Sequence, residues 1–277
     1  MEVTTMHDFQ AKLTSLYNSK LESFKSSQHE HQVADYQPDV IELISKLEIQ
    51  SVLEVLGIQP HFNVLDIGAG GGRWTLALAD KVASITAIEP SALCDLLRSR
   101  TKSFSNVHCI HQTFEDFELT QQYDLVIIYG TLMYMPGDQH IQAILSKAAK
   151  AVREDGYFVL GEAIARRRKW IADWRNTPKE LFESTLPNCQ YWEVLRTGEF
   201  YSNLCRANYL YLVAKFESHA PLFGRSSLWP VVKSLGWKTI YTYNKACRDL
   251  YGMLKYLLDM RRMRIMIWKK PGPIALE

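Results

Sequence analysis

An α/β fold with a doubly wound, mostly parallel sheet is predicted by three features of the sequence. Apolar strand-like runs alternate with helical patterns from residue 61 to residue 163. The run at 123–129 is apolar on both faces, which is typical of a central parallel strand. A glycine-rich turn at 68–72 joins the first run to a helical pattern. Such alternation implies right-handed crossovers that place helices on both faces of the sheet.

The glycine turn is the most informative segment of the chain. Residues 61–80 read HFNVLDIGAGGGRWTLALAD, with Gly68, Ala69 and Gly70 between a strand and a helix that begins near Trp74. Glycine has no Cβ, so a ligand can lie against the backbone. The free N–H groups at a helix start are expected to face that ligand. The turn therefore predicts a nucleotide-like cofactor.

The residues around the turn distinguish between two possible cofactors, a nicotinamide dinucleotide and S-adenosylmethionine. The nicotinamide fingerprint G-x-G-x-x-G fails because Arg73 takes the place of its third glycine. Asp66 would repel a pyrophosphate but would favour the ammonium and sulfonium of S-adenosylmethionine. Glu89 lies 21 residues after Gly68, a spacing that suits a carboxylate binding ribose hydroxyls. The ordered set predicts S-adenosylmethionine, and a structural turn beside a solvated acid is the alternative.

The remaining elements follow from periodicity and capping signals. Apolar stripes at 13–17, 40–44 and 52–56 predict N-terminal helices, the last stopped by Gly57 and Pro60. A helix with one apolar stripe starts at Asp138, and Gly156 is expected at its C′ position. The patterns further predict a helix over 91–102 capped by Ser91, strands over 107–111 and 157–160, and later strands over 209–216, 237–243 and 262–268.

Several motifs resemble those of the class I S-adenosylmethionine-dependent methyltransferases. VLDIGAGGGRWTLALA followed by ITAIEPS is similar to motif I and the next strand of that family. The resemblance continues through QTFEDF, YDLVIIYGTLMYM and DGYFVLGEA, and covers about 60–163. It implies a Rossmann-like, seven-stranded sheet closed by an antiparallel pair, 237–243 with 262–268. We expect a helical cap over 1–59, a core over 60–163 and 226–277, and an acceptor-binding lid over 164–225, together one compact unit.

The resemblance also assigns the cofactor site. The glycine turn would meet the methionyl part, Asp66 its ammonium and Glu89 the ribose. The family's usual acid for the adenine amino group is replaced here by Thr113, so the adenine partner stays open, and Phe114 either covers adenine or belongs to the core. The expected cofactor-binding residues are Asp66, Gly68, Ala69, Gly70, Glu89, Pro90, Thr113, Phe114, Glu115, Tyr129 and Gly130.

Three residues near the ends of the fourth and fifth strands are candidate catalytic bases: Tyr134, His140 and Glu162. A base is needed only when the acceptor is protonated at neutral pH, because methyl transfer is otherwise a matter of positioning. An exposed histidine at a helix start is the alternative for His140. For Glu162 the alternatives are substrate binding and helix capping.

The acceptor is expected to be a small organic molecule methylated on O or N. The fourth strand is followed by YGTL rather than the Asn/Asp-Pro-Pro-Tyr/Phe motif of nucleobase and glutamine enzymes. No acids stand there to hold magnesium, so no metal is expected. Aromatic residues in the predicted lid would line the acceptor pocket. The basic run at 166–169 is either a solvated helix face or a clamp for an anionic acceptor.

Bulk properties limit the partners and the compartment. The net charge of +2 does not call for nucleic acid. The five cysteines show no C-x-x-C spacing, and neither a signal peptide nor an 18-residue apolar run is apparent, so we expect a cytoplasmic protein without a membrane anchor. The oligomeric state is not indicated. Alternative functions are a non-catalytic S-adenosylmethionine-binding scaffold or sensor, an RNA or protein methyltransferase, and a nicotinamide oxidoreductase disfavoured by Arg73 and Asp66.

Overall fold

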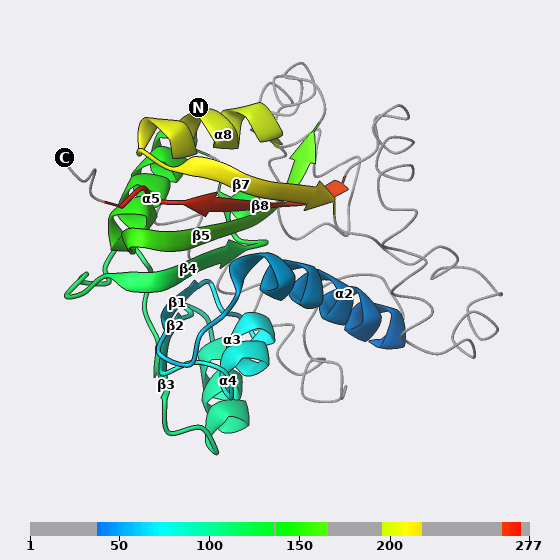
Figure 1. Cartoon of the computed structure of the whole chain (residues 1–277). Helices are drawn as coiled ribbons and strands as arrows, with labels where there is room; N and C mark the ends of the chain where they lie inside the picture. The colour runs from blue at the N-terminus through cyan, green and yellow to red at the C-terminus, as the bar shows by residue number, and fades with distance from the viewer. Residues whose placement is uncertain (1–37, 136, 166–195, 218–261, 273–277) are drawn as a thin grey trace, which may run out of the picture.

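The computed structural model describes residues 38–135, 137–165, 196–217 and 262–272 (Figure 1). Helices and strands alternate along the first half of this region, as the sequence predicts. The elements are α2 (Pro38–Leu56), β1 (Asn63–Ile67), α3 (Arg73–Leu78), β2 (Ser84–Ile88), α4 (Leu93–Thr101), β3 (Val107–Ile110), β4 (Tyr123–Tyr129), the 3₁₀ turn η1 (Leu132–Tyr134), α5 (Asp138–Ala151), β5 (Val152–Ala165), β6 (Arg196–Thr197), α8 (Gly198–Ala207), β7 (Tyr211–Glu217) and β8 (Arg262–Lys269).

One mostly parallel sheet forms the centre of the described region. Its strands follow the order β3-β2-β1-β4-β5-β8-β7, and the two-residue β6 pairs with the end of β5. The first five strands of this path are parallel, whereas β8 is antiparallel to both of its neighbours. The order reverses between β1 and β4, which confirms the doubly wound fold. Ligands of such sheets bind at this switch point, beyond the carboxyl ends of the strands.

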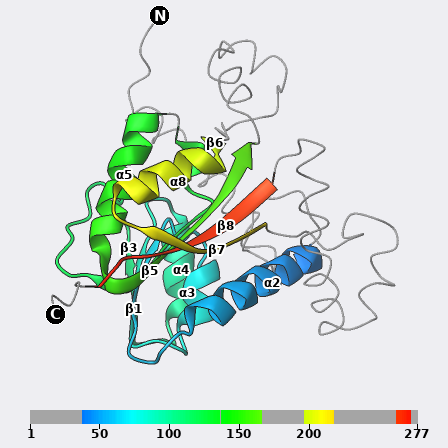
Figure 2. The same ribbon diagram turned by 45° about the horizontal axis from the view of Figure 1, so that its top comes forward.

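Helices cover both faces of the sheet (Figure 2). On one face, α5 and α8 pack on β4 and β5 through side chains such as Ile141, Tyr201 and Phe158. On the other face, α2, α3 and α4 pack through side chains such as Val52, Trp74 and Leu97. Each large apolar side chain buried in this way contributes roughly 1.5–3 kcal/mol, so both faces stabilise the strand ends that carry the site. None of the described helices is long and apolar enough to cross a bilayer.

The predicted C′ position of Gly156 is wrong. Helix α5 starts at Asp138 as expected, but it ends at Ala151, and Val152 is already extended. The strand register then shifts between Tyr123 and Leu125 of β4, and the left-handed residue is Asp155, with φ of 59°. The backbone of 155–156 hydrogen-bonds to Lys270, beyond the end of β8. A contact over more than 110 residues therefore sets this turn, and no local pattern reveals it.

The predicted antiparallel pair is also corrected. The partner of β8 is β7, with Tyr211 opposite Lys269 and Glu217 opposite Arg264. Residues 196–217 therefore belong to the sheet and its covering layer, and the acceptor-binding role expected for 164–225 stays a prediction. The predicted strand at 237–243 and the basic run at 166–169 lie outside the described residues.

A single helix, α2, replaces the two predicted stripes at 40–44 and 52–56. It stops at Gly57, as predicted, where φ is 55° and the N–H donates to the carbonyl of Leu53 at 3.2 Å. The helix packs on α3, the helix that follows the glycine turn. The stripe at 13–17 lies outside the described residues.

Candidate cofactor and active site

The glycine turn packs directly against the segment that follows β4. Gly68, Gly70 and Gly72 have φ angles of 72°, 54° and 97°, a left-handed conformation that favours glycine. A Cβ on Gly68 would lie 2.5 Å from Oγ1 of Thr131, so only glycine fits there. Around Gly70, by contrast, no heavy atom of the described residues lies within 4 Å of such a Cβ. The turn is thus closed at Gly68, where it contacts Thr131, and open at Gly70, where a ligand can approach the backbone.

The N–H groups of the first three residues of this turn are bonded within the protein. Gly68 and Ala69 both donate to the carbonyl of Ile88, at 2.9 and 3.0 Å. The N–H of Gly70 donates to Oε2 of Glu89 at 2.8 Å. These three donors hold the turn against the end of β2, and the expectation that the N–H groups at the start of α3 face a ligand stays a prediction.

Glu89 lies where β2 ends, beside the turn. Its carboxylate also accepts hydrogen bonds from the N–H and Oγ of Ser91, at 3.0 and 2.5 Å. Burial raises the pKa of Glu89, although the hydrogen bonds from Ser91 and Gly70 oppose this. Helix α4 begins at Leu93, whose N–H donates to Oγ of Ser91 at 3.3 Å, whereas Pro90 is exposed. The contact of Glu89 with ribose stays a prediction.

Asp66 is more deeply buried than the sequence suggests. Its side chain is 2% exposed, and Oδ2 accepts a hydrogen bond from Oγ1 of Thr75 at 2.7 Å. Burial raises the pKa of Asp66 to about 6, more than the hydrogen bonds from Thr75 lower it. In this structure the hydrogen bond from Thr75 to Asp66 links α3 to the end of β1. Its predicted contact with the cofactor ammonium remains untested.

The segment 112–116, predicted to meet adenine, and the adjacent Phe117 are anchored by α5. Nζ of Lys147 donates to the carbonyls of Phe114, Glu115 and Phe117, at 2.8, 2.8 and 2.6 Å. Phe114 is 4% exposed and belongs to the apolar layer beneath α5. Oγ1 of Thr113 donates to Asp116 at 2.6 Å. Sequence reasoning missed Lys147, because nothing in the chain distinguishes it from the other lysines of an amphipathic helix.

His140 meets this same segment rather than Glu162. Its Nε2 lies 2.7 Å from Oε1 of Glu115, and the two side chains are 16% and 29% exposed. Burial raises the pKa of Glu115, but the hydrogen bond from His140, a backbone hydrogen bond and the charge interaction with His140 together outweigh it and leave that pKa below its ordinary value. A partly exposed imidazole beside an orienting carboxylate can accept a proton from an acceptor.

Glu162 holds the backbone of the loop after β4. The residue is fully buried, and Oε1 accepts hydrogen bonds from the N–H groups of Thr131 and Leu132 at 3.0 and 2.8 Å. Oε2 accepts a third from Met133 at 3.1 Å. Burial raises the pKa of this carboxyl to about 7 despite these bonds. The contacts match the helix-capping alternative. Tyr134 ends η1, and its side chain lies outside the described residues.

Arg196 is a second residue that sequence reasoning missed. It lies on β6 beside the end of β5 and is fully buried. Its Nε donates to Oδ1 of Asp138 and its Nη2 to the carbonyl of Met135, both at 2.9 Å. With Glu162 at one end and Arg196 at the other, the described parts of segment 131–138 are held on both sides. The flanking sequence has no motif that marks Arg196.

A third buried polar cluster joins α2, α3 and β4. Arg73 forms an ion pair with Glu48, and the hydroxyl of Tyr129 donates to the same carboxylate. The guanidinium lies 4.3 Å from the centroid of the Tyr129 ring, a cation–π contact. The hydroxyl of Tyr129 is thus turned toward α2. Gly130 has φ of 64° and donates to the carbonyl of Gly161 at 2.7 Å.

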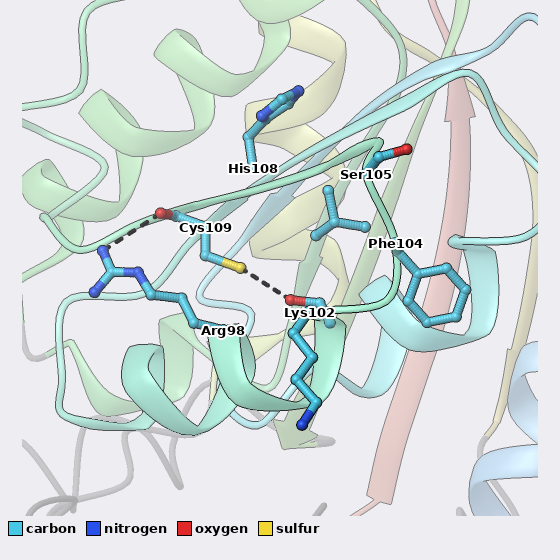
Figure 3. A pocket seen from close by; sticks show the side chains of 8 residues that line it. Arg98, Lys102, Phe104, Ser105, His108 and Cys109 are labelled. Carbon is cyan, nitrogen blue, oxygen red and sulfur yellow. Dashed lines mark hydrogen bonds between the residues drawn. The ribbon is translucent and has the colours of Figure 1, made fainter.

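A separate pocket lies where α4 ends and β3 begins (Figure 3). Arg98 donates there to the carbonyl of Cys109 at 3.4 Å. This part of the sheet is the beginning of β3, whereas the cofactor turn lies beyond the carboxyl ends of the strands. The pocket is therefore not part of the candidate site. Its lining residues are Arg98, Thr101, Lys102, Phe104, Ser105, Val107, His108 and Cys109. Within the described residues, no group of three His, Cys, Asp or Glu could hold a metal ion.

Comparisons with known proteins agree with this geometry. Residues 64–156 match the family described as a methyltransferase domain. Ubiquinone biosynthesis O-methyltransferase from Rickettsia bellii is 24% identical over 214 residues, which cover 71% of this chain and 83% of that protein. An rRNA adenine N-6-methyltransferase from Lysinibacillus sphaericus is 23% identical over 126 residues, 45% of this chain and 50% of that protein.

A solved structure extends the likeness to the whole fold. Magnesium protoporphyrin IX methyltransferase from Synechocystis PCC 6803, with bound S-adenosylmethionine, superposes with a TM-score of 0.59 at 12% identity. The superposition covers 95% of this chain and 97% of that one. The fold, the glycine turn and the family match define a class I S-adenosylmethionine-dependent methyltransferase domain. The protein is a methyltransferase that uses S-adenosylmethionine.

Proposed function

We propose that the enzyme methylates an oxygen or nitrogen of a small organic acceptor, with a hydroxyl oxygen as the favoured target. The extent of the alignments carries this proposal. The ubiquinone biosynthesis O-methyltransferase aligns with 71% of the chain, well beyond the cofactor-binding motifs. The rRNA enzyme aligns with only 45%. Likeness outside the cofactor domain supports an acceptor site of the small-molecule kind.

The residues around the turn fit S-adenosylmethionine. The backbone is open at Gly70, and the buried Glu89 carboxylate beside it accepts hydrogen bonds, as ribose binding requires. A pyrophosphate would find no free N–H on Gly68, Ala69 or Gly70. We place the methionyl part of the cofactor between Gly70 and the end of β4, and its nucleoside toward Glu89 and the segment 112–116.

Bound S-adenosylmethionine supplies a methyl group that its sulfonium makes electrophilic, and the protein positions the acceptor for in-line attack. Such positioning is worth roughly 7–11 kcal/mol in well-oriented reactions. We assign a positioning role to Glu162, because its carboxylate is engaged by three backbone N–H groups and keeps Thr131 against Gly68. His140, oriented by Glu115, is the better candidate to accept a proton from a hydroxyl acceptor.

Methyl transfer from labelled cofactor tests the proposal. The enzyme is incubated with methyl-labelled S-adenosylmethionine and separate panels of phenols, hydroxy acids, amines, rRNA fragments and proteins. We expect label in a phenol or hydroxy acid, and a slower reaction with His140→Ala at unchanged affinity for S-adenosylhomocysteine. Label in rRNA or protein alone would contradict the proposal. Failure to bind S-adenosylhomocysteine in a calorimeter would remove its basis.

A further inference from the structure

The carboxylate of the cofactor needs a donor near the glycine turn, where three backbone N–H groups are already bonded to the end of β2. S-adenosylmethionine ends in an amino acid whose carboxylate, once buried, needs hydrogen-bond donors or a cation. The N–H groups of Gly68 and Ala69 are bonded to Ile88, and that of Gly70 to Glu89. A side chain beside the turn is therefore a candidate donor for the carboxylate.

Arg73 is a cationic side chain that lies between the glycine turn and the end of β4. It is the first residue of α3, directly after the turn, and its guanidinium stacks on Tyr129 at the end of β4. These are the two elements between which we place the methionyl part. The Arg73 side chain is only 12% exposed, so little water screens its charge.

One donor of this buried guanidinium is not yet paired. Nη2 of Arg73 is bonded to Glu48, but its Nε–H is buried and has no hydrogen-bond partner among the described residues. Buried donors are almost always satisfied, so an orphan of this kind calls for a partner. A carboxylate oxygen is the acceptor that a guanidinium binds most strongly.

We propose that the Nε–H of Arg73 binds the carboxylate of the cofactor, and that Glu48 and Tyr129 are positioning residues for it. This inference rests on the cofactor placement proposed above. Glu48 holds Nη2, and the Tyr129 ring supports the guanidinium plane. Glu48 comes from α2, so the N-terminal helix contributes to cofactor recognition. Arg73 thereby selects ligands that carry the amino acid carboxylate over those that lack it.

Two ligands that differ only in the carboxylate test the proposal by calorimetry: S-adenosylhomocysteine and its decarboxylated form, S-adenosyl-3-thiopropylamine. Wild type should bind the first at least ten-fold more tightly, as expected for a hydrogen bond between charged groups. Arg73→Met should lose at least ten-fold affinity for S-adenosylhomocysteine and stay within two-fold for the decarboxylated ligand.

A second variant covers the case in which Arg73→Met fails to fold, since that change leaves Glu48 buried without its partner. The double variant Glu48→Gln/Arg73→Met removes both charges and should show the same ligand-selective loss. Arg100→Met is the matched control, because Nη1 of Arg100 also touches the turn, at the carbonyl of Gly71 and 2.6 Å away. Any effect of Arg100→Met should be equal for the two ligands.

The outcomes separate this proposal from the cofactor assignment. Equal losses for both ligands in the Arg73 variants would show that Arg73 acts through the fold, and unchanged affinities would show that it is not used; either result overturns the proposal. Wild type that binds both ligands equally overturns it as well. Wild type that binds neither ligand would instead reject the cofactor placement on which it rests.

Discussion

The cofactor half and the acceptor half of the site are built in different ways. Around the glycine turn, the contacts of the two acids predicted from the sequence join residues close in sequence: Asp66 and Thr75 are 9 positions apart, and Gly70 and Glu89 are 19 apart. Around segment 131–138, Glu162 reaches back 31 residues to Thr131, and Arg196 reaches back 58 to Asp138. The contacts of the first half can be predicted from a sequence motif, whereas those of the second half form only when distant segments of the chain pack together.

The long-range half should be the more sensitive to a single substitution. Arg196→Met breaks an ion pair between a fully buried guanidinium and the 34% exposed Asp138, and leaves the carbonyl of Met135 without its donor. Breaking a fully buried pair typically costs about 3–5 kcal/mol; because water solvates Asp138 in part, we expect the free energy of unfolding to fall by about 2 kcal/mol. Urea denaturation followed by tryptophan fluorescence measures it. Arg206→Met, at the exposed end of α8, is the control and should change stability little. A loss no larger than that of the control would remove Arg196 from the framework of the site.

The motif half should respond in ligand affinity rather than in stability alone. Glu89→Gln keeps the shape of the side chain but removes the charge that we expect to bind ribose. Hydrogen bonds to charged groups contribute about 1.5–3 kcal/mol, so affinity for S-adenosylhomocysteine should fall ten-fold or more. Calorimetry with adenosine as a second ligand should show a similar fold-loss, because adenosine carries the same ribose. Unchanged affinity for both ligands would place the ribose elsewhere.

The smallest expected effect is the change in stability with pH that comes from protonation of Asp66 and Glu162, one acid in each half of the site. Folded-state pKa values of about 6 for Asp66 and about 7 for Glu162 lie above those of unfolded carboxyls. The folded protein therefore binds these protons more tightly, and its stability should decline as pH rises through this range. Between pH 6 and pH 8 we expect a loss of about 1 kcal/mol, mostly from Glu162. Unfolding of wild type and Glu162→Gln at several pH values tests this, and an equally steep decline in Glu162→Gln would assign the effect to other groups.

Sequence patterns predicted the elements whose signals are local. Strand β4 and the start of α5 were predicted at their observed positions, since an apolar run and a single apolar stripe are visible without knowledge of neighbours. The antiparallel pair was assigned to the wrong strand, because several strand-like runs near the end of the chain compete to pair with β8. The end of α5 was misplaced for a related reason: the backbone of 155–156 is fixed by Lys270.

The candidate site shows the same division at the level of side chains. The turn and Glu89 were identified from spacing, and the structure brings them together. Glu162 was identified as an important acid, but its contacts with Thr131 and Leu132 favour positioning over base chemistry. Lys147 and Arg196 carry no sequence signal, because a buried cation looks like a surface one until its carbonyl or carboxylate partner is known.

The α/β fold and the class of cofactor could be predicted from local patterns, because glycine conformations, apolar periodicity and a fixed acid spacing act over fewer than 30 residues. Packing in three dimensions sets which donors of the turn are already bonded, which strand closes the sheet and which charges are buried together. Those properties depend on pairs of groups that packing brings close together. The cost of desolvating one group is offset by its contact with the other, so the sequence around either group alone does not reveal that the two are paired.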